Sequence, residues 1–199
     1  MSLQPDGEGR TVVEDAAALS HCRRVLVMGC NGAGKTTFAR RLGAALGIDV
    51  VHLDSLLFRQ GWEFTPRDEF VRLQESVVSR EHWIIDGNCL STFDVRAGWA
   101  EAVIVFDLPA AVCVLRTLRR TLQYLGRSRP DLPDDCVERL DAGYMRFVWR
   151  VFTFHRHFMP RVERCVATTA PGTLVVRIRS SRVAHDVLRA LENRPRTPD

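Results

Sequence analysis

The sequence contains almost no lysine. Arginine and lysine together number 28, and Lys35 is the only lysine among them. Guanine recognition by GTPases uses an Asn-Lys-x-Asp motif, which is absent because Lys35 follows Gly34 and not an asparagine. The missing motif argues against a GTPase-type switch. The composition also indicates that position 35 requires a compact ammonium group, since a planar guanidinium is not equivalent to it.

The cysteine pattern and the hydropathy exclude further classes of protein. The six cysteines form no Cys-x-x-Cys pair, so no zinc-binding or dithiol redox spacing is present. Scattered cysteines are typical of a reducing compartment, and we expect a cytoplasmic protein. No apolar run approaches the ~18 residues of a membrane span, and the acidic N-terminus lacks the apolar core of a signal peptide. We therefore expect no membrane partner.

The length and composition favour one folded domain. The chain has 199 residues, of which 46% are hydrophobic, enough for one sizeable core. We expect a flexible N-terminal arm at residues 1–22, a domain at residues 23–192 and a disordered tail at residues 193–199. The net charge is +4, but residues 116–164 hold eleven arginines against six acidic residues. This basic segment favours a ligand that carries phosphate, either a small molecule or nucleic acid.

The stretch Gly29–Thr36 matches the phosphate-binding motif G-x-x-x-x-G-K-[ST], also named Walker A. An apolar run at residues 24–28 precedes it and an amphipathic helical pattern at residues 36–46 follows, which is the context that the motif requires. In such a loop, N–H groups surround the phosphates, the lysine contacts the β- and γ-phosphates, and the threonine hydroxyl binds Mg²⁺. The alternative is a glycine-rich turn that binds no ligand. The expected nucleotide-binding residues are Asn31, Gly32, Ala33, Gly34, Lys35, Thr36 and Thr37.

The rest of the chain alternates between apolar runs typical of buried strands and amphipathic patterns typical of helices. This alternation predicts an α/β fold with a five-stranded parallel sheet and helices on both faces. We expect the strands at residues 24–28, 49–53, 82–86, 102–107 and 173–178. The amphipathic pattern of residues 134–158 predicts one long helix that bends or breaks at Pro160. Its second apolar stripe, at Met145, Trp149 and Phe152, is a candidate subunit contact.

Several motifs together resemble a known family. The phosphate loop is joined by His52-Leu53-Asp54, Gly61-Trp62, Trp83-Ile84-Ile85-Asp86-Gly87-Asn88, Phe106-Asp107-Leu108-Pro109 and the pair Arg116 and Arg120. From Val25 to Leu191, this series resembles the adenylate-kinase-related P-loop proteins named "DNA topology modulation protein". The resemblance implies a three-layer fold like that of P-loop nucleoside-monophosphate kinases. It also implies a separate acceptor pocket and a lid over the phosphates, formed by the loop at residues 125–133.

The resemblance also assigns roles to five residues. It implies that Asp86 is the Walker B carboxylate that holds Mg²⁺ through water and that Arg116 stacks on adenine. Arg120, one helical turn after Arg116, would face the same side and reach phosphate. Arg127 and Arg129 occupy the positions of lid arginines that close over the transferred phosphoryl group. The alternatives are a turn-capping aspartate at position 86 and a solvated basic face for the arginines.

The acceptor side departs from adenylate kinase. The Asp-Gly-Phe-Pro-Arg sequence of that enzyme is Asp-Gly-Asn-Cys-Leu at residues 86–90, so the arginine that grips an acceptor monophosphate is missing. Arg96 and Arg59 are the candidates to replace it. Asp54, at the carboxyl end of the second expected strand, resembles the carboxylate that orients an acceptor hydroxyl in small-molecule kinases. The alternative for Asp54 is a loop-capping aspartate, and AMP is not the favoured acceptor.

These features predict an ATP-dependent kinase, a phosphotransferase that moves the γ-phosphoryl group of Mg-ATP to a small-molecule or nucleotide acceptor. The alternative is a nucleotide-binding, DNA-associated regulatory protein with little kinase activity, although the sequence lacks a helix-turn-helix, a zinc finger and a dense basic stripe. The expected cofactors are ATP and Mg²⁺, and we expect a monomer or a homodimer. The expected catalytic residues are Lys35, Asp54, Arg120, Arg127 and Arg129, and the expected metal ligands are Thr36 and Asp86.

Overall fold

The chain folds around one parallel β-sheet. The structure is a computed structural model, and it describes residues 10–127 and 140–193. The sheet has five strands in the order β2-β3-β1-β4-β5, and every neighbouring pair is parallel. The predicted α/β architecture is thereby confirmed. The strands are β1 (Arg24–Gly29), β2 (Val50–His52), β3 (Trp83–Asp86), β4 (Ala102–Phe106) and β5 (Leu174–Ile178).

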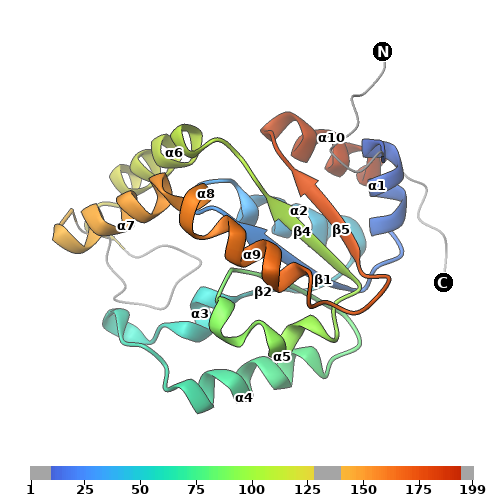
Figure 1. Cartoon of the computed structure of the whole chain (residues 1–199), viewed down its shortest axis with the longest axis horizontal. Coiled ribbons are helices and arrows are strands. Elements are labelled where there is room, and N and C mark those ends of the chain that lie inside the picture. Colours follow the sequence, from blue (N-terminus) through green and yellow to red (C-terminus); the bar gives the residue numbers. More distant parts are fainter. Residues whose placement is uncertain (1–9, 128–139, 194–199) are drawn as a thin grey trace.

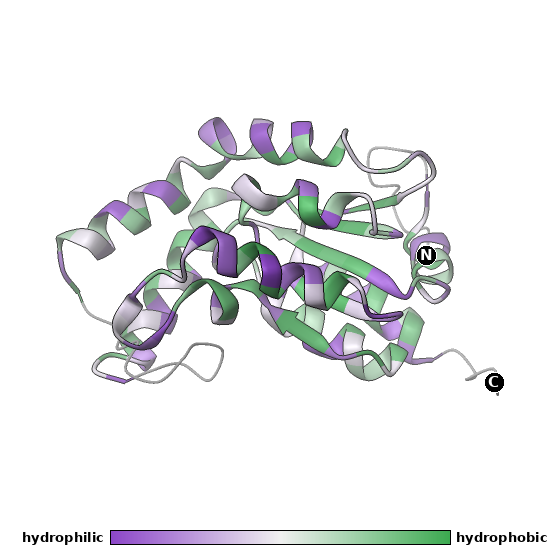
Figure 2. Ribbon diagram, turned by 90° about the horizontal axis from the view of Figure 1, so that it is seen from below, coloured by the Kyte–Doolittle hydropathy of each residue, from purple (hydrophilic) through white to green (hydrophobic). Residues whose placement is uncertain are grey.

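The three central strands form the core of the sheet. β1, β3 and β4 are buried along almost their whole length, because each is a nearly continuous apolar run rather than an alternating one. Such runs are what a parallel sheet covered on both faces requires. In Figure 2 the strands are mainly green, the hydrophobic colour, and lie among helices that alternate between green and purple.

Helices cover both faces of the sheet. The first half of the chain contains α1 (Val12–Leu19), α2 (Lys35–Leu46), α3 (Leu53–Leu57), the 3-10 helix η1 (Gln60–Trp62), α4 (Arg67–Val78), the 3-10 helix η2 (Leu90–Thr92) and α5 (Asp94–Ala97). The second half contains α6 (Ala110–Gln123), α7 (Ala142–Phe152), α8 (Phe154–His157), α9 (Met159–Val166) and α10 (Ser181–Glu192). On one face α2 packs on β1 and β3, and α10 packs on β5, α1 and α2. On the other face α9 packs on β1 and α5, and Figure 1 shows α9 in front of the sheet with α2 behind it.

Residues 10–22 belong to the folded domain, in contrast to the expected flexible arm. α1 begins with a capping box, in which the Thr11 hydroxyl accepts from the Glu14 N–H and the Glu14 carboxylate accepts from the Thr11 N–H. Its apolar side, which includes Val12 and Leu19, is buried, and the helix packs on α10 and β5. A helix of two turns is not stable alone. Its partner α10 lies far away in the sequence, so the pattern of residues 10–22 did not reveal this packing.

The long helix expected at residues 134–158 is divided. Within its described part, α7, α8 and α9 follow one another with breaks between them. Thr153 separates α7 from α8, and its hydroxyl donates to the Trp149 carbonyl oxygen at 2.8 Å, a bond that bends helices. Pro160 lies in the first turn of α9, where proline is tolerated because its missing N–H would have no helical partner. The break therefore comes before Pro160.

Some apolar side chains lie outside the core. On α7, Met145, Trp149 and Phe152 are exposed, and their role as a subunit contact stays a prediction. No helix in the described part of the chain is long and apolar enough to cross a bilayer.

Candidate nucleotide-binding site

The carboxyl ends of the central strands bring the sequence motifs together. In the sheet register, Asp86 at the end of β3 lies beside Val27 of β1 and His52 of β2. Gly29, the last residue of β1, lies beside Phe106 of β4. The phosphate loop, the predicted metal ligand and the start of the acceptor-side segment therefore share one edge of the sheet. This is the edge at which ligands bind in such folds.

The phosphate loop curls because three of its glycines adopt backbone angles that L-residues with side chains rarely adopt. Gly29, Gly32 and Gly34 have φ values of 128°, 79° and 100°. A Cβ atom at Gly29 would lie 2.2 Å from the Phe106 carbonyl oxygen, and one at Gly32 would lie 2.3 Å from the Cys113 carbonyl oxygen. The loop passes so close to β4 and α6 that neither position accepts a side chain without a shift of backbone.

Lys35, the first residue of α2, is folded back onto the loop. Its exposure is only 8%, and its Nζ atom donates to the Cys30 carbonyl oxygen at 3.0 Å. Gly34 is the N-cap of α2 and provides no side-chain cap, so no side chain at that position satisfies the first N–H groups of the helix. Uncapped helix N–H groups next to an ammonium group form a site for phosphate.

Thr36 and Asp86 meet at the edge of the sheet. Thr36 Oγ1 donates to Asp86 Oδ2 at 2.7 Å, and His52 Nδ1 lies 3.1 Å from the same oxygen. Burial of the carboxyl group disfavours its charged form, but a hydrogen bond from His52 and the positive charge of Lys35 act in the opposite direction. Together with the Thr36 hydroxyl they outweigh burial and lower the pKa of Asp86. The carboxylate is therefore ionised at neutral pH.

The second carboxylate oxygen of Asp86 is suited to a metal or to a metal-bound water. Asp86 Oδ1 is buried, and no donor within the described residues reaches it. A buried charged oxygen without a partner costs about 1–3 kcal/mol or more, which a divalent cation would offset. Within residues 10–127 and 140–193, no cluster of three or more His, Cys, Asp or Glu could hold a metal alone. The site fits Mg²⁺, which commonly takes one or two protein oxygens and completes its shell with phosphate and water.

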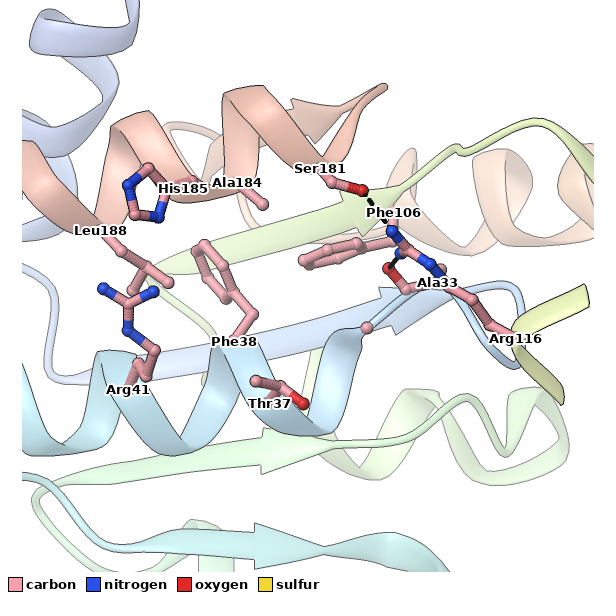
Figure 3. Close-up of a pocket in the computed structure, with 11 residues that line it drawn as sticks. Ala33, Thr37, Phe38, Arg41, Phe106, Arg116, Ser181, Ala184, His185 and Leu188 are labelled. Carbon is pink, nitrogen blue, oxygen red and sulfur yellow. Dashed lines mark hydrogen bonds between the residues drawn. The ribbon is translucent and has the colours of Figure 1, made fainter. Parts of the chain in front are cut away.

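A cavity of about 380 Å³ lies beside the phosphate loop. It is bounded by the start of α2, by Arg116 on α6 and by the side of α10 that carries His185 (Figure 3). Phe38 and Phe106 form an apolar part of its lining. Arg116 Nη2 donates to Ser181 Oγ at 2.7 Å, which holds the guanidinium group at one end of the cavity. This size and this mainly apolar lining with a few polar groups are typical of sites for small ligands.

The α10 side of this cavity was not predicted from the sequence. Ala184, His185 and Leu188 line it, and α10 reaches the phosphate loop because β5 pairs with β4. No motif marks these positions, since in the sequence they are part of an ordinary amphipathic helix. Four predicted residues also line the cavity: Ala33, Gly34, Thr37 and Arg116.

Three of the four remaining predicted catalytic residues lie within the described part of the chain. Asp54 is exposed in the first turn of α3, two residues after His52. Arg120 is half-buried on α6, and Arg127 is exposed just beyond the end of that helix. Arg129 and most of the expected lid at residues 125–133 lie outside the described residues. The catalytic roles of these four residues stay predictions.

Arg96 does not face an acceptor pocket. Its exposure is 0%, and it donates to the carbonyl oxygens of Asn88, Cys89 and Thr92 at 3.0, 3.3 and 3.2 Å. Burial lowers the pKa of Arg96 to about 10, so it remains charged at neutral pH. The expectation that Arg96 grips an acceptor phosphate is wrong, because the side chain is buried and both Nη atoms donate to acceptors of the protein, while Nε has no partner within the described residues. Arg59, the other candidate, forms a surface ion pair with an acidic residue of α4.

The cysteine of the phosphate loop is a neutral packing residue. A hydrogen bond with Cys113 and burial raise the pKa of the Cys30 thiol. A buried neutral thiol is a weak nucleophile, and the five described cysteines are all free. Cys30 therefore packs the loop against Cys113 of α6 and provides no reactive group.

The chain has the fold of P-loop kinases of the nucleoside-monophosphate-kinase type. The shikimate kinase from Acinetobacter baumannii in complex with shikimate is 14% identical, covers 89% of this chain and 95% of its own, and gives a TM-score of 0.51. The shikimate kinase from Bacteroides thetaiotaomicron is 15% identical, covers 86% and 97%, and gives a TM-score of 0.50. A gluconokinase from Sinorhizobium meliloti 1021 is 18% identical, covers 85% and 91%, and gives a TM-score of 0.47.

The comparisons show the fold and leave the substrate undetermined. No protein-family model matches the chain, and no curated protein matches it. Identities of 14% and 15% to the two shikimate kinases are evidence of a shared architecture alone. The resemblance to the "DNA topology modulation protein" family therefore stays a prediction.

Proposed function

We propose that this chain is a kinase that transfers the γ-phosphoryl group of Mg-ATP to a hydroxyl group of a small acceptor. One observation carries the proposal: the Lys35 ammonium, the Thr36 hydroxyl and the buried Oδ1 atom of Asp86 lie together at the phosphate loop. A cation, a hydroxyl and an ionised carboxylate at one helix N-terminus are the groups that a nucleoside triphosphate with Mg²⁺ requires.

The cavity beside the loop would hold the adenosine part of the nucleotide. Arg116 borders it with a flat guanidinium group, which can stack on a purine ring. His185 and the hydroxyl of Thr37 lie on its wall and offer polar contacts. The triphosphate would extend from the cavity into the loop, where Lys35 would contact its β- and γ-phosphates.

Two residues at the sheet edge, Thr36 and Asp86, would hold Mg²⁺. Thr36 would provide a hydroxyl ligand, and Asp86 would hold a metal-bound water. Hydrogen bonds from Thr36 and His52 fix the orientation of the Asp86 carboxylate. When bound, the metal ion neutralises charge on the phosphates, and Arg120, Arg127 and Arg129 would add to this neutralisation.

Asp54 would activate the acceptor. Its carboxylate would take the proton of the acceptor hydroxyl while that oxygen forms a bond to the γ-phosphorus. The bond between the γ-phosphorus and the oxygen that bridges it to the β-phosphate would break, and ADP would leave. The burial of Arg96 removes one candidate for gripping an acceptor phosphate, which supports a simple alcohol over a nucleoside monophosphate.

Calorimetric titration with Mg-ATP tests the nucleotide half of the proposal. We expect wild-type protein to bind, and Lys35→Ala to weaken binding by roughly 10- to 100-fold, as the loss of a charge-assisted hydrogen bond implies. Arg40→Ala is the matched control, because Arg40 is an exposed cation on the same helix. A wild-type protein that does not bind Mg-ATP would refute the proposal.

Release of ADP in the presence of a panel of alcohols, sugars and nucleoside monophosphates tests the acceptor half. We expect at least one acceptor to raise the rate, and Asp54→Asn to lose this increase while it retains Mg-ATP binding. The transferase proposal fails if none of these compounds raises ADP release above the acceptor-free rate. If the same protein then shifts duplex DNA in a salt-dependent way, the DNA-associated alternative gains support.

A further inference from the structure

The side chain of Asn88 is bonded to both polar groups of one residue in the phosphate loop. Its Oδ1 accepts from the Gly29 N–H and its Nδ2 donates to the Gly29 carbonyl oxygen, each at 2.9 Å. The backbone pairing between β3 and β1 ends just before this point, where the Gly87 N–H donates to the Val27 carbonyl oxygen at 3.1 Å. The Asn88 amide therefore adds one more pair of hydrogen bonds after the last backbone pair, and these two bonds hold the first residue of the loop.

The main chain around Asn88 is held by a buried arginine. Arg96 Nη2 donates to the Asn88 carbonyl oxygen at 3.0 Å and to the Cys89 carbonyl oxygen at 3.3 Å. The other arm, Nη1, donates to Gln74 Oε1 and to the Thr92 carbonyl oxygen. Arg96 and Gln74 each have an exposure of 0%. Breaking such bonds leaves a buried charge without partners, so the arrangement resists change.

The turn that carries Asn88 also has unusual backbone angles on both sides. Gly87 has a φ of 144°, and a Cβ atom there would lie 2.7 Å from the Cβ atom of Leu53. Cys89 has a φ of 21°, although it is not a glycine. Conformations of this kind persist only where surrounding contacts enforce them. The bonds from Arg96 to this turn are such contacts.

We propose that Gln74, Arg96 and Asn88 form a positioning relay for the phosphate loop. Gln74 orients Arg96, and Arg96 fixes the turn at residues 87–89. The Asn88 amide then holds Gly29 in the position from which the loop curls around a phosphate. The three residues act through Gly29 and do not touch the nucleotide. The relay rests on the proposed function, because it takes a nucleotide to be the ligand of the loop.

The relay explains why the protein keeps a charged side chain in its interior. A buried arginine is costly unless its donors are satisfied, and Nε of Arg96 has no partner within the described residues. An apolar residue at such a position is often as stabilising. Arg96 lies on α5, and its bonds connect this helix to Gln74 of α4 and to the turn that follows β3. α4 also packs on α3, which carries Asp54. The relay therefore links the acceptor-side helices to the loop that would bind ATP.

The first test removes the two hydrogen bonds between the Asn88 side chain and Gly29. Asn88→Ala should weaken Mg-ATP binding about tenfold, since two neutral hydrogen bonds are lost. Asn88→Asp should weaken it further, because a carboxylate cannot donate to the Gly29 carbonyl oxygen and adds negative charge near the phosphates. Gln123→Ala is the matched amide-to-alanine control at an exposed position, and its affinity should equal that of wild type. Equal affinities of wild type and Asn88→Ala would overturn the relay.

The second test asks whether Arg96 acts through Asn88. Arg96→Lys keeps the charge but loses one of the two donor arms, and we expect a severalfold weaker affinity for Mg-ATP. In the Asn88→Ala background the same change should have little further effect, because residues of one network are not additive. Full additivity of the two changes would show that Arg96 acts by another route. If Arg96→Lys does not fold, Gln74→Met replaces it in the same double-mutant comparison with Asn88→Ala.

The third test separates the relay from the proposed function. Hydrogen–deuterium exchange of a peptide spanning residues 26–34, measured without nucleotide, should be faster in Asn88→Ala than in wild type. Peptides from α10 should exchange alike in both proteins, which a general loss of stability would not produce. If wild-type protein binds no Mg-ATP, the proposed function fails. The exchange measurement would still show whether Asn88 holds the loop in position. Unchanged exchange at residues 26–34 would overturn the relay.

Discussion

The close contact between the phosphate loop and α6 leads to a prediction about Gly32. In Gly32→Ala, the new Cβ atom would lie 2.3 Å from the Cys113 carbonyl oxygen and 2.6 Å from Thr117 Oγ1. The first of these atoms belongs to the backbone of a helix and cannot rotate away. Such an overlap costs about 1–3 kcal/mol. The φ of 79° at this position adds about 1–2 kcal/mol for a residue that has a side chain.

The net loss should be smaller than the sum of these costs. Alanine also restricts the unfolded chain, which offsets about 0.4–1 kcal/mol. We therefore expect Gly32→Ala to lower the free energy of unfolding by about 2–4 kcal/mol. Gly47→Ala is the matched control, because Gly47 has a similar φ of 69° and a Cβ atom there would meet nothing within 4 Å. Its loss should be limited to about 1 kcal/mol, the backbone cost alone.

Urea denaturation of the three proteins measures this difference, and Mg-ATP titration provides a second readout. Gly32→Ala should also bind Mg-ATP weakly, because the loop must move away from α6 to accommodate the methyl group. Gly47→Ala should bind as wild type does, since Gly47 is at the far end of α2. If both variants lose the same stability, the loop is not packed against Cys113 as described, and the reasoning fails.

Three further outcomes are expected. Asp86→Asn should lower the Mg²⁺ affinity of the ATP complex roughly 10- to 100-fold, and an unchanged Mg²⁺ titration would count against Asp86 as a metal site. Arg116→Ala should weaken binding of ATP more than binding of inorganic tripolyphosphate, as competition titrations would show, whereas Arg119→Ala on the exposed side of α6 should change neither. Burial opposes ionisation of Glu101, but two main-chain N–H groups and the Arg24 guanidinium outweigh it and lower the pKa of that carboxyl. Wild type should therefore exceed Glu101→Gln by ~1 kcal/mol in unfolding free energy at pH 7. This advantage should shrink as the pH falls below the ordinary value of 4.5 and vanish below the lowered pKa, and a difference that persists in strong acid would contradict it.

The phosphate loop could be located from the sequence because all of its determinants are contiguous. Glycines that permit φ values such as the 79° of Gly32 and the 100° of Gly34 precede a lysine and a threonine directly. The parallel sheet was predictable for a related reason, since strands that are buried on both faces consist of short, nearly continuous apolar runs in the sequence. The nearness of Asp86 to the loop then follows, because parallel neighbours end at one edge.

Only part of the lining of the cavity beside the loop could be predicted from the sequence. Arg116 was assigned through a resemblance, but His185 and Leu188 lie on a helix whose sequence shows nothing beyond amphipathicity. Their position depends on the pairing of β5 with β4, which brings residues far apart in the chain to the start of α2. A strand order that is fixed by long-range pairing cannot be read from local periodicity.

Arg96 shows where inference from residue type fails. An arginine near an acceptor loop suggests phosphate binding, because most arginines keep their charged end in water. Arg96 is buried because Gln74 and the carbonyl oxygens at residues 88, 89 and 92 together satisfy its two arms. Those acceptors come from α4, from a turn with unusual φ values and from a 3-10 helix, and no spacing rule places them around one side chain. The sequence therefore indicates a cation in this region, and only the three-dimensional arrangement shows that it faces the protein rather than a substrate.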